Sequence, residues 1–458
     1  MAQVEFDAAL IERYAGSGPR YTSYPTAVQF TPDYTHERYI KDARATNASG
    51  KPLSLYVHIP FCKSLCYYCG CSKVVTRNAA RVSAYLHDLH KEIALQGALF
   101  DRARPVTQLH FGGGTPTYLS ALELQTLMDR LGDSFQLVQD GTQEFSIEVD
   151  PRTVDMAALE RLRDHGFNRL SLGVQDFDID VQKAINRLQS IDEVRSLTRH
   201  ARNIGFRSVS YDLIYGLPKQ SPQSFERTLT EVIALRPDRI AIYNYAHLPQ
   251  RFRGQRMIRR EDLPSNSQKL DILGRSLAML TQAGYEYIGM DHFALPGDDL
   301  AVAQRNGTLQ RNFQGYSTHA DCDLVGLGSS AIGRVGRSFA QNLVNTRDYA
   351  RALADDRLPI MRGLRMTDDD QRRAEVIGEL MCFDEVRFDR FETRHAVPFT
   401  DYFGTEVASL APMAGDALIT IDADAIRVTR RGRMLLRNIA QVFDRYNRPD
   451  SRRFSQQI

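Results

Sequence analysis

Short runs of β-branched and aromatic residues alternate with longer amphipathic stretches from about residue 53 of the chain. The short runs predict strands at Leu53–Ile59, Gln108–Phe111, Phe145–Val149, Arg169–Gly173, Ser208–Ile214 and Arg239–Asn244. Apolar residues at helical spacing between them predict helices at Ala79–Leu99, Ala121–Leu131, Asp155–His165, Asp180–Asn203 and Ser224–Leu235. Repeated strand–helix units are typical of an α/β protein with a parallel sheet, so we expect a barrel or a partial barrel.

The two ends of the chain differ from this repeat. Gly18–Thr26 is rich in turn formers and tyrosine, which predicts an ordered arm on the surface instead of a helix. After a predicted domain boundary near Gly363–Asp370 we expect helices, a hairpin of two strands at Ala417–Ile421 and Ala425–Val428, and a helix at Arg433–Tyr446, a combination that resembles a winged helix. The expected parts are an N-terminal arm (1–50), a barrel (51–365) and a mostly helical C-terminal domain (366–458).

Composition narrows the class of protein. Among 458 residues, 43% hydrophobic and 25% charged residues are typical of a globular protein. Residues 1–14 lack a basic start followed by an apolar stretch, and no run of eighteen apolar residues occurs, so we expect a cytoplasmic protein without a membrane span. A net charge of +2 gives no overall attraction to nucleic acid. The basic stretch Arg427–Arg453 predicts a solvated face, although nucleic acid or an anionic ligand could also explain it.

Most of the cysteines lie in one loop after the first predicted strand. They are Cys62, Cys66, Cys69 and Cys71, and the first three form a Cys-x3-Cys-x2-Cys run. Three thiolates on a short loop can hold three irons of a [4Fe-4S] cluster and leave the fourth iron open for a ligand. A structural zinc loop with Cys71 as the fourth ligand is the alternative, but no second cysteine pair of the usual spacing accompanies it. Cys322 and Cys382 are isolated, and we expect ordinary buried thiols.

Polar residues and glycines follow the predicted strands at their carboxyl ends, which in parallel βα architectures meet at one mouth. The glycines at 112–114 follow the second strand, where they let a bound group approach the backbone or simply form a tight turn. Glu148, Gln175 and Asp212 lie at the next three strand ends and together predict a polar binding site, although a single carboxylate there is normally a helix cap. Arg187 falls on the following predicted helix, where the sequence alone favours a surface arginine.

The cysteine run followed by Gly-Gly-Gly-Thr-Pro resembles the radical S-adenosylmethionine (SAM) superfamily. Within it, the chain closely resembles the oxygen-independent coproporphyrinogen III oxidases, over nearly its whole length and without a departure from the motifs of that family. The segments that carry the resemblance are Arg20–Thr26, Tyr56–Phe61, Cys69–Cys71, Gly173–Phe177, Asn312–Tyr316 and Gly326–Ile332.

The resemblance implies roles for individual residues. Cys62, Cys66 and Cys69 would ligate the cluster, and the methionine part of one SAM would bind the open iron. The family is unusual in binding a second SAM beside the first. The residues implied for the first SAM are Tyr56, Gly113, Glu148 and Ile332, and those for the second are Tyr68, Gly114, Thr115, Gln175, Arg187, Asp212 and Ala246. Cys71 is implied to be needed for activity without being a ligand, and Gln314 to lie in the active-site cavity.

The resemblance also implies a fold and a reaction. The fold is a three-quarter (β/α)6 TIM-like barrel whose mouth is closed by the arm and the C-terminal domain. The reaction is the anaerobic oxidative decarboxylation of two propionates of coproporphyrinogen III to vinyl groups, which gives protoporphyrinogen IX in heme biosynthesis. A propionate β-carbon has no acidic proton, so a 5′-deoxyadenosyl radical formed from SAM would remove its hydrogen.

The same resemblance implies partners. They are the substrate and an electron donor such as flavodoxin or ferredoxin, for a monomeric chain that binds no nucleic acid. Because the substrate bears four carboxylates, the basic stretch Arg251–Arg260 after the sixth predicted strand predicts arginines that pair with propionates.

Two alternatives belong to other functional classes. A heme chaperone of the same superfamily keeps the cluster cysteines but lacks counterparts of Cys71 and of the Arg20–Thr26 arm. Both are present in this chain, which favours the oxidase. A nucleic-acid-binding protein that acts through the winged-helix-like region leaves the cysteine loop and the strand-end residues unexplained.

Overall fold

One thirteen-stranded sheet organises most of the chain in the computed structural model, which describes residues 4–16, 18–319 and 321–447. Its parallel strands are, in spatial order, β9 (Arg239–Asn244), β8 (Ser208–Tyr215), β7 (Arg169–Gln175), β6 (Glu144–Val149), β4 (Pro105–Gly113), β1 (Leu53–Ile59) and β14 (Asp323–Leu327). The strands predicted from the pattern are all confirmed. The pattern did not predict β14, because this five-residue strand is buried throughout and so lacks polar alternation.

Antiparallel strands extend the sheet at both ends. They are β10 (Glu286–Gly289) and β11 (His292–Ala294) beyond β9, and β15 (Ile332–Val335), β16 (Ser338–Asn342) and β17 (Ile360–Arg365) beyond β14, while β5 (Gln136–Leu137) pairs with β4. Two small pairs lie apart from the sheet, namely β2 (Phe61–Cys62) with β3 (Val74–Val75) and β12 (Gln310–Asn312) with β13 (Gly315–Ser317).

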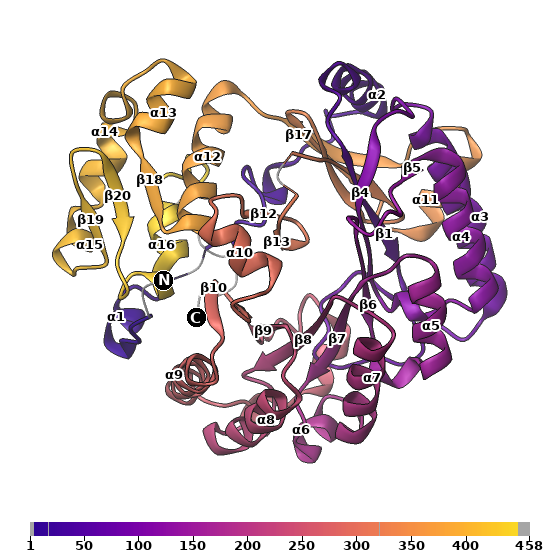
Figure 1. The fold of residues 1–458 in the computed structure, drawn as a ribbon, viewed down its shortest axis with the longest axis horizontal. Coiled ribbons are helices and arrows are strands. Elements are labelled where there is room, and N and C mark those ends of the chain that lie inside the picture. The colour runs from indigo at the N-terminus through magenta and orange to yellow at the C-terminus, as the bar shows by residue number, and fades with distance from the viewer. Residues whose placement is uncertain (1–3, 17, 320, 448–458) are drawn as a thin grey trace.

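Helices cover the outer face of the parallel strands (Figure 1). They are α3 (Ala79–Gly97), α4 (Ala121–Ser134), α5 (Met156–Asp164), α7 (Ile191–Asn203), α8 (Pro222–Leu235) and α9 (Asn266–Gln282). Two shorter helices, α10 (Asp299–Arg305) and α11 (Thr346–Ala354), accompany the antiparallel strands. Within the described part of the chain, no helix combines the length and the apolar character that a membrane crossing requires.

One predicted helix is wrong, because Asp180–Asn203 divides into α6 (Ile179–Ala184) and α7. Asn186 adopts a left-handed φ of 56° after α6, and Ser190 begins α7 as an N-cap. Apolar residues continue at helical spacing across the break, so the pattern did not reveal it. The break turns Arg187 inward, and the arginine expected at the surface is only 6% exposed.

The C-terminal residues build a hydrophobic cluster of their own. Its elements are α12 (Asp368–Phe383), α13 (Phe388–His395), α14 (Phe399–Ser409), α15 (Ala411–Gly415), α16 (Leu436–Gln441) and a sheet of β18 (Glu385–Arg387), β20 (Ala425–Val428) and β19 (Ile419–Ile421). The predicted hairpin is confirmed as β19 and β20. The predicted helix at Arg433–Tyr446 is wrong in extent, since α16 is shorter and the Asp444 side chain accepts the Tyr446 N–H at 2.8 Å in place of a helical carbonyl.

The segment Gly18–Thr26 of the N-terminal arm has no helix, as predicted. It does not lie exposed on the surface, however, because its tyrosines pack into this cluster. Between α1 (Ala8–Arg13) and α2 (His36–Ala45), Tyr21 and Tyr24 are 4% and 5% exposed and join the C-terminal hydrophobic cluster. The Tyr21 hydroxyl donates to Asp444 at 3.0 Å, and the Tyr24 hydroxyl accepts the Arg445 N–H at 3.1 Å. The two aromatic rings supply enough apolar area to bury a segment that has no regular structure.

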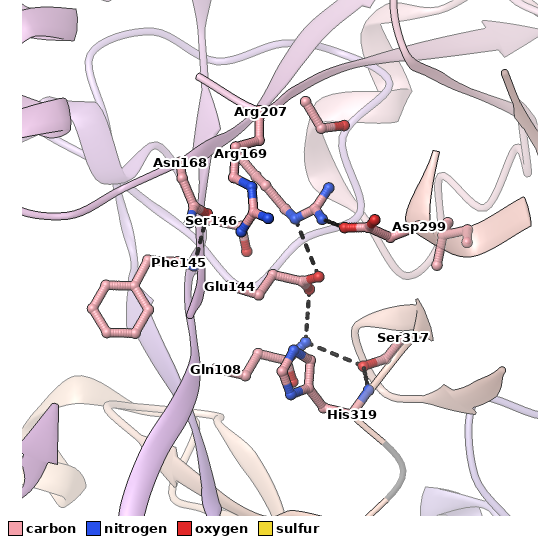
Figure 2. Close-up of polar contacts among 12 residues, drawn as sticks. Gln108, Glu144, Phe145, Ser146, Asn168, Arg169, Arg207, Asp299, Ser317 and His319 are labelled. Atoms are coloured by element: carbon pink, nitrogen blue, oxygen red, sulfur yellow. Dashed lines mark hydrogen bonds and ion pairs between the residues drawn. The ribbon is translucent and has the colours of Figure 1, made fainter. Parts of the chain in front are cut away.

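Polar side chains gather at the amino-terminal end of the parallel strands (Figure 2). Arg169 pairs with Glu144 at 3.1 Å and with Asp299, and Gln108 donates to Glu144 at 2.8 Å and to Ser317 at 3.1 Å. Burial opposes ionisation of Glu144, yet the positive charges of Arg169 and Arg239 lower its pKa to about 2. These side chains pair their charges and hydrogen-bonding groups with one another at this end of the sheet. A binding site is therefore expected at the opposite, carboxyl ends of the strands.

A buried carboxylate ties α3 to the loop after β14. Glu92 is fully buried and accepts hydrogen bonds from the Gly328 N–H at 2.7 Å, the Tyr349 hydroxyl at 2.6 Å and the Asn342 amide at 2.6 Å. Burial raises the pKa of Glu92 from its ordinary value of 4.5 to about 7. The loop is thereby held against β1.

Replacing Glu92 with Gln is expected to remove a pH dependence of stability. Because the folded-state pKa is raised, the contribution of Glu92 is complete below its ordinary pKa of 4.5 and is lost as the pH rises through about 7. The difference in the free energy of unfolding between the wild type and Glu92→Gln should therefore fall by about 3 kcal/mol as the pH rises from below 4.5 to above about 7. Urea unfolding of the apoprotein at several pH values, followed by circular dichroism, measures this difference. A difference that does not change with pH would contradict the expectation.

Candidate active site

A cavity of about 510 Å³ lies at the carboxyl ends of the central parallel strands, beside the cysteine loop. The predicted site residues that line it are Cys62, Cys66, Tyr68, Cys69, Cys71, Gly113, Gly114, Thr115, Glu148, Gln175, Arg187 and Asp212. Among the predicted residues, Tyr56, Ala246, Gln314 and Ile332 do not line it. The fold therefore gathers most of the predicted residues from separate strand ends into one space.

The cysteine loop is held from two sides. Pairing of β2 with β3 closes its base. Asn186, in the break before α7, donates to the Leu65 carbonyl at 2.8 Å, and Gln255 donates to the Tyr68 carbonyl at 2.9 Å. The segment after β9 and the helix break thus both hold the cysteine loop in place.

Two guanidinium groups lie beside the Cys66 sulfur. Arg152 Nη2 is 3.5 Å and Arg187 Nη1 is 3.6 Å from Cys66 Sγ. Asp150 holds both arginines, at 2.7 Å from Arg152 and 3.1 Å from Arg187, and Arg187 also donates to the Gly173 carbonyl at 2.6 Å. Burial opposes ionisation of Asp150, but the two arginines lower its pKa. The positive charge next to Cys66 favours an anionic group in the cavity.

Asp150 and Arg152 were not among the predicted site residues. A signal was available, because Asp150 follows Glu148 by two positions and a strand directs such residues to the same face. Arg152 becomes part of the site only through the turn after β6, which the sequence pattern did not predict.

The other thiols differ in acidity. The Cys71 thiol donates a hydrogen bond to the Cys69 sulfur. This bond and the charge of Lys73 lower the pKa of Cys69 to about 6. The same bond raises the pKa of Cys71, which must keep its proton to donate it. Burial raises the pKa of Cys62 to about 11, although Thr115 Oγ1 donates to its sulfur at 3.6 Å. Cys69 is therefore more readily deprotonated than Cys62 or Cys71 without a bound metal.

The glycine run is required by close approach and is not merely a tight turn. Gly113 has a φ of 115°, and a Cβ there would lie 2.6 Å from the ring of His58. A Cβ on Gly114 would lie 2.7 Å from the backbone carbonyl of Pro60. The Gly113 N–H donates to the Glu148 carboxylate at 3.0 Å. The end of β4 can therefore lie directly against the start of the cysteine loop.

Tyr56 and Ile332 lie beside the cavity without lining it. The rings of Tyr56 and His110 stack at 5.9 Å, and a Cβ on Gly112 would lie 3.1 Å from the Tyr56 ring and 2.9 Å from a Glu148 oxygen. Tyr56 pairs across strands with Gly326, whose Cβ would in turn lie 2.8 Å from the Ile332 backbone. Ala246, just after β9, has no comparable contact with the cavity wall among the described interactions.

A smaller inner cavity of about 160 Å³ shares a wall with the first. Glu148, Ser171, Asp212 and Tyr243 line both cavities. Ser171 donates to Asp212 at 2.8 Å, and burial raises the pKa of Asp212 to about 6. Gln314 lines the inner cavity, and its buried Nε2 has no hydrogen-bond partner among the described residues. Polar groups thus extend inward from the cysteine-lined cavity.

The arrangement of the thiols fits an iron–sulfur cluster better than a single ion. In the part of the chain that the structure describes, no group of three or more His, Cys, Asp or Glu side chains is arranged to hold a metal ion. A structural zinc site with Cys71 needs four ligands around one ion, which this geometry does not provide. A cubane cluster binds each thiolate to a different iron, so three thiols that line one cavity beside cationic groups suit it.

The first basic stretch is exposed, whereas the second is mostly half-buried and its Arg433 is only 5% exposed, so the second is not simply the predicted solvated face. The exposed arginines of the first are Arg251, Arg253, Arg256, Arg259 and Arg260. Arg259 is paired with Asp262 at 3.0 Å. In the second stretch, Arg427 pairs with Glu385 at 2.8 Å, and the part beyond residue 447 lies outside the described residues. The isolated Cys382 is buried as predicted, while Cys322 is half-buried.

Comparisons with known proteins agree with this site. The pattern of the Radical SAM superfamily matches residues 56–232, and that of the HemN C-terminal domain matches residues 366–435. The chain is 51% identical to an oxygen-independent coproporphyrinogen III oxidase of Pseudomonas aeruginosa, over 97% of this chain and 96% of the relative. It is 49% identical to the Escherichia coli protein of the same name, over 98% and 97% of the two chains.

The fold of the chain is also similar to that of a solved structure. The structure of coproporphyrinogen III oxidase from Escherichia coli, described as a radical SAM enzyme, superposes with a TM-score of 0.92 at 47% identity. The match covers 97% of this chain and 100% of that one. The α/β fold and the cysteine-lined cavity are thus found in a chain that is similar over its whole length to these proteins. The chain belongs to the radical SAM superfamily and, within it, to the oxygen-independent coproporphyrinogen III oxidase family.

Proposed function

We propose that this chain converts coproporphyrinogen III to protoporphyrinogen IX in heme biosynthesis, by anaerobic oxidative decarboxylation of two propionates to vinyl groups. The observation that carries the proposal is the cavity in which the three-cysteine loop faces the polar strand ends. Relatives that bear the name of this activity match nearly the whole chain, and so support the same conclusion.

The proposed cofactors are a [4Fe-4S] cluster and SAM. Cys62, Cys66 and Cys69 would ligate three irons, and the methionine part of a SAM would occupy the fourth. When bound, the reduced cluster and SAM supply a 5′-deoxyadenosyl radical that removes a propionate β-hydrogen, which no side-chain base could remove at a useful rate. We further propose a second SAM beside the first.

The proposed contacts follow the family motifs. Those of the first SAM are Tyr56, Gly113, Glu148 and Ile332, and those of the second are Tyr68, Gly114, Thr115, Gln175, Arg187, Asp212 and Ala246. Support comes from the cavity lining, which includes all of these except Tyr56, Ile332 and Ala246. Cys71 and Gln314 are proposed to act in catalysis, with Gln314 reaching the site through the inner cavity.

The surrounding side chains orient these groups and exclude water. The glycine backbone leaves room for a bound group, while Asp150 fixes the two guanidiniums that lie against Cys66. The buried Cys62 and Cys66 are removed from bulk water, which protects a reactive species from side reactions.

The finer architecture is also a proposal. We propose a three-quarter (β/α)6 TIM-like barrel at 51–365, an N-terminal arm at 1–50 and a winged-helix-like C-terminal domain at 366–458. The order of the parallel strands supports the barrel, and the separate C-terminal hydrophobic cluster supports the C-terminal domain.

The cellular setting that we propose is the cytoplasm. All six cysteines are unpaired thiols, which is typical of a reducing compartment. The chain would act as a monomer, take electrons from a donor such as flavodoxin or ferredoxin, and bind no nucleic acid.

An anaerobic assay tests the function. Cluster-reconstituted, reduced protein is incubated with SAM and coproporphyrinogen III, and 5′-deoxyadenosine and oxidised protoporphyrin are followed by chromatography. Both products are expected. If SAM is cleaved and heme is bound stably but no protoporphyrin appears, the activity is that of a heme chaperone and the proposal is wrong.

Replacing Cys66 with Ser is expected to reduce the iron and sulfide content of the reconstituted protein, because a serine hydroxyl is a poor ligand for this cluster. Cys322→Ser is the matched control, since Cys322 lies outside the cysteine loop and should keep the content of the wild type. Iron and acid-labile sulfide analysis measures both. Equal contents in the two variants would remove Cys66 from the ligand set.

Replacing Cys71 with Ser separates cluster binding from activity. The cluster content should remain that of the wild type, while formation of protoporphyrin should fall by a factor of about 100 or more, the size typical for loss of a group active in catalysis. Full activity with an intact cluster would exclude Cys71 from the mechanism.

Replacing Arg187 with Gln is expected to weaken SAM binding roughly tenfold, because it removes charge-assisted hydrogen bonds from the cavity wall. The control is Arg199→Gln, which changes an exposed arginine on α7. Calorimetric titration of SAM into the reconstituted protein measures both affinities. Equal affinities for Arg187→Gln and the wild type would show that Arg187 does not contribute to SAM binding.

A further inference from the structure

Three arginines from distant parts of the chain converge next to the carboxyl ends of β8 and β9. Arg20 belongs to the N-terminal arm, Arg311 to β12 and Arg437 to α16. Arg20 Nη1 pairs with Asp291 Oδ2 at 3.1 Å, and the Asp291 carbonyl accepts the backbone N–H of Ile242 in β9 at 2.8 Å. Asp291 therefore anchors the arm to the end of the sheet.

The charges of the three guanidiniums act on one another. Burial first, and then the charges of Arg20 and Arg311, lower the pKa of Arg437 to about 10, while Asp291 opposes this change. Burial and Arg311 likewise lower the pKa of the neighbouring His292 to about 3. Asp291 is the carboxylate beside these groups, and it is already paired with Arg20. The region thus holds an excess of positive charge.

Two of the arginines have unused hydrogen-bond donors. Within the described residues, the side-chain nitrogens Nε and Nη1 of Arg311 and Nη1 of Arg437 are buried and have no hydrogen-bond partner. Buried charged donors left unpaired are costly, and most buried polar groups in native proteins have partners. Such donors point to an anion that binds here.

Aromatic contacts connect this place to the active site. The Arg311 guanidinium lies over the ring of Tyr316 at 4.7 Å, and Tyr316 packs on His292 with ring centroids 5.4 Å apart. His292 in turn contacts the ring of Tyr243 at 6.0 Å. Tyr243 lines both the cysteine-lined cavity and the inner cavity. The arginines therefore lie within a few side chains of the proposed cofactors.

We propose that Arg20, Arg311 and Arg437 form a carboxylate-binding site for one propionate of the substrate, with Asp291 as the residue that positions Arg20. This inference rests on the proposed function and adds the residues that recognise the tetracarboxylate. A guanidinium can bind a carboxylate with two parallel hydrogen bonds. The buried donors of Arg311 and Arg437 would hold it more strongly than donors exposed to water. The exposed arginines of Arg251–Arg260 are screened by water and are weaker candidates.

Binding of coproporphyrin III, the stable oxidised form of the substrate, tests the site directly. It is titrated into cluster-reconstituted Arg311→Gln, Arg437→Gln and wild-type protein, and porphyrin fluorescence is followed. Each variant should bind roughly tenfold more weakly, since each loses a charge-assisted contact. The matched control is Arg430→Gln, an exposed arginine in the same C-terminal region, which should bind like the wild type. Iron content and the affinity for SAM should not change in any variant.

Arg437→Lys separates recognition from folding. It keeps the positive charge but loses the bidentate geometry, so its affinity should lie between those of the wild type and Arg437→Gln. In the enzymatic assay, KM for coproporphyrinogen III should rise while kcat stays within about twofold, which a general loss of structure would not produce.

The outcomes distinguish this inference from the proposed function. Wild-type affinity in both Arg311→Gln and Arg437→Gln overturns the site, whether or not the wild type forms protoporphyrin. Weaker binding only in the triple variant of Arg251, Arg253 and Arg256 to Gln overturns it as well and assigns the propionate to that stretch. If the two single variants bind weakly but the wild type forms no protoporphyrin, the carboxylate site stands and the proposed reaction is wrong.

Discussion

The contact between the glycine run and the cysteine loop is the constraint on which the rest of the site depends. The Gly114 N–H donates to the Ile59 carbonyl at 2.8 Å and the Thr115 N–H to the Phe61 carbonyl at 2.9 Å, so the end of β4 is bonded to the chain on both sides of Pro60. A side chain on Gly114 would overlap the Pro60 backbone. This contact fixes the position of the cysteine loop relative to the sheet. The residues at the ends of β6, β7 and β8 can then line the same cavity as the thiols.

Positive charge is arranged in two places around this contact, in different ways. Beside Cys66, the guanidiniums of Arg152 and Arg187 are held by a shared carboxylate, so their direction is defined before any ligand binds. Around Asp291, the carboxylate holds Arg20, while Arg311 and Arg437 keep side-chain donors that have no partner within the described residues. The first arrangement suits a resident cofactor with a fixed position, and the second suits an anion that arrives and leaves with each turnover.

Much of the fold followed from hydrophobic spacing, and the exceptions have physical causes. The parallel strands were predicted because each has a distinct apolar run, but β14 is too short and too uniformly buried to give a period. The break before α7 depends on the left-handed backbone at Asn186, which apolar periodicity does not report, and so Arg187 was expected at the surface. Strand-end spacing brought Glu148 and Asp212 to one cavity, whereas Arg311 and Arg437 come together only through tertiary packing.

The burial of Tyr21 and Tyr24 among C-terminal residues has a consequence for the order of folding during synthesis. The arm leaves the ribosome first, but its partners Asp444 and Arg445 are among the last described residues to be made. The strands that carry the cysteine loop can pair well before that point, since domains generally fold in the order of synthesis. The nascent protein therefore passes through a stage in which the sheet is formed and the arm is not yet docked.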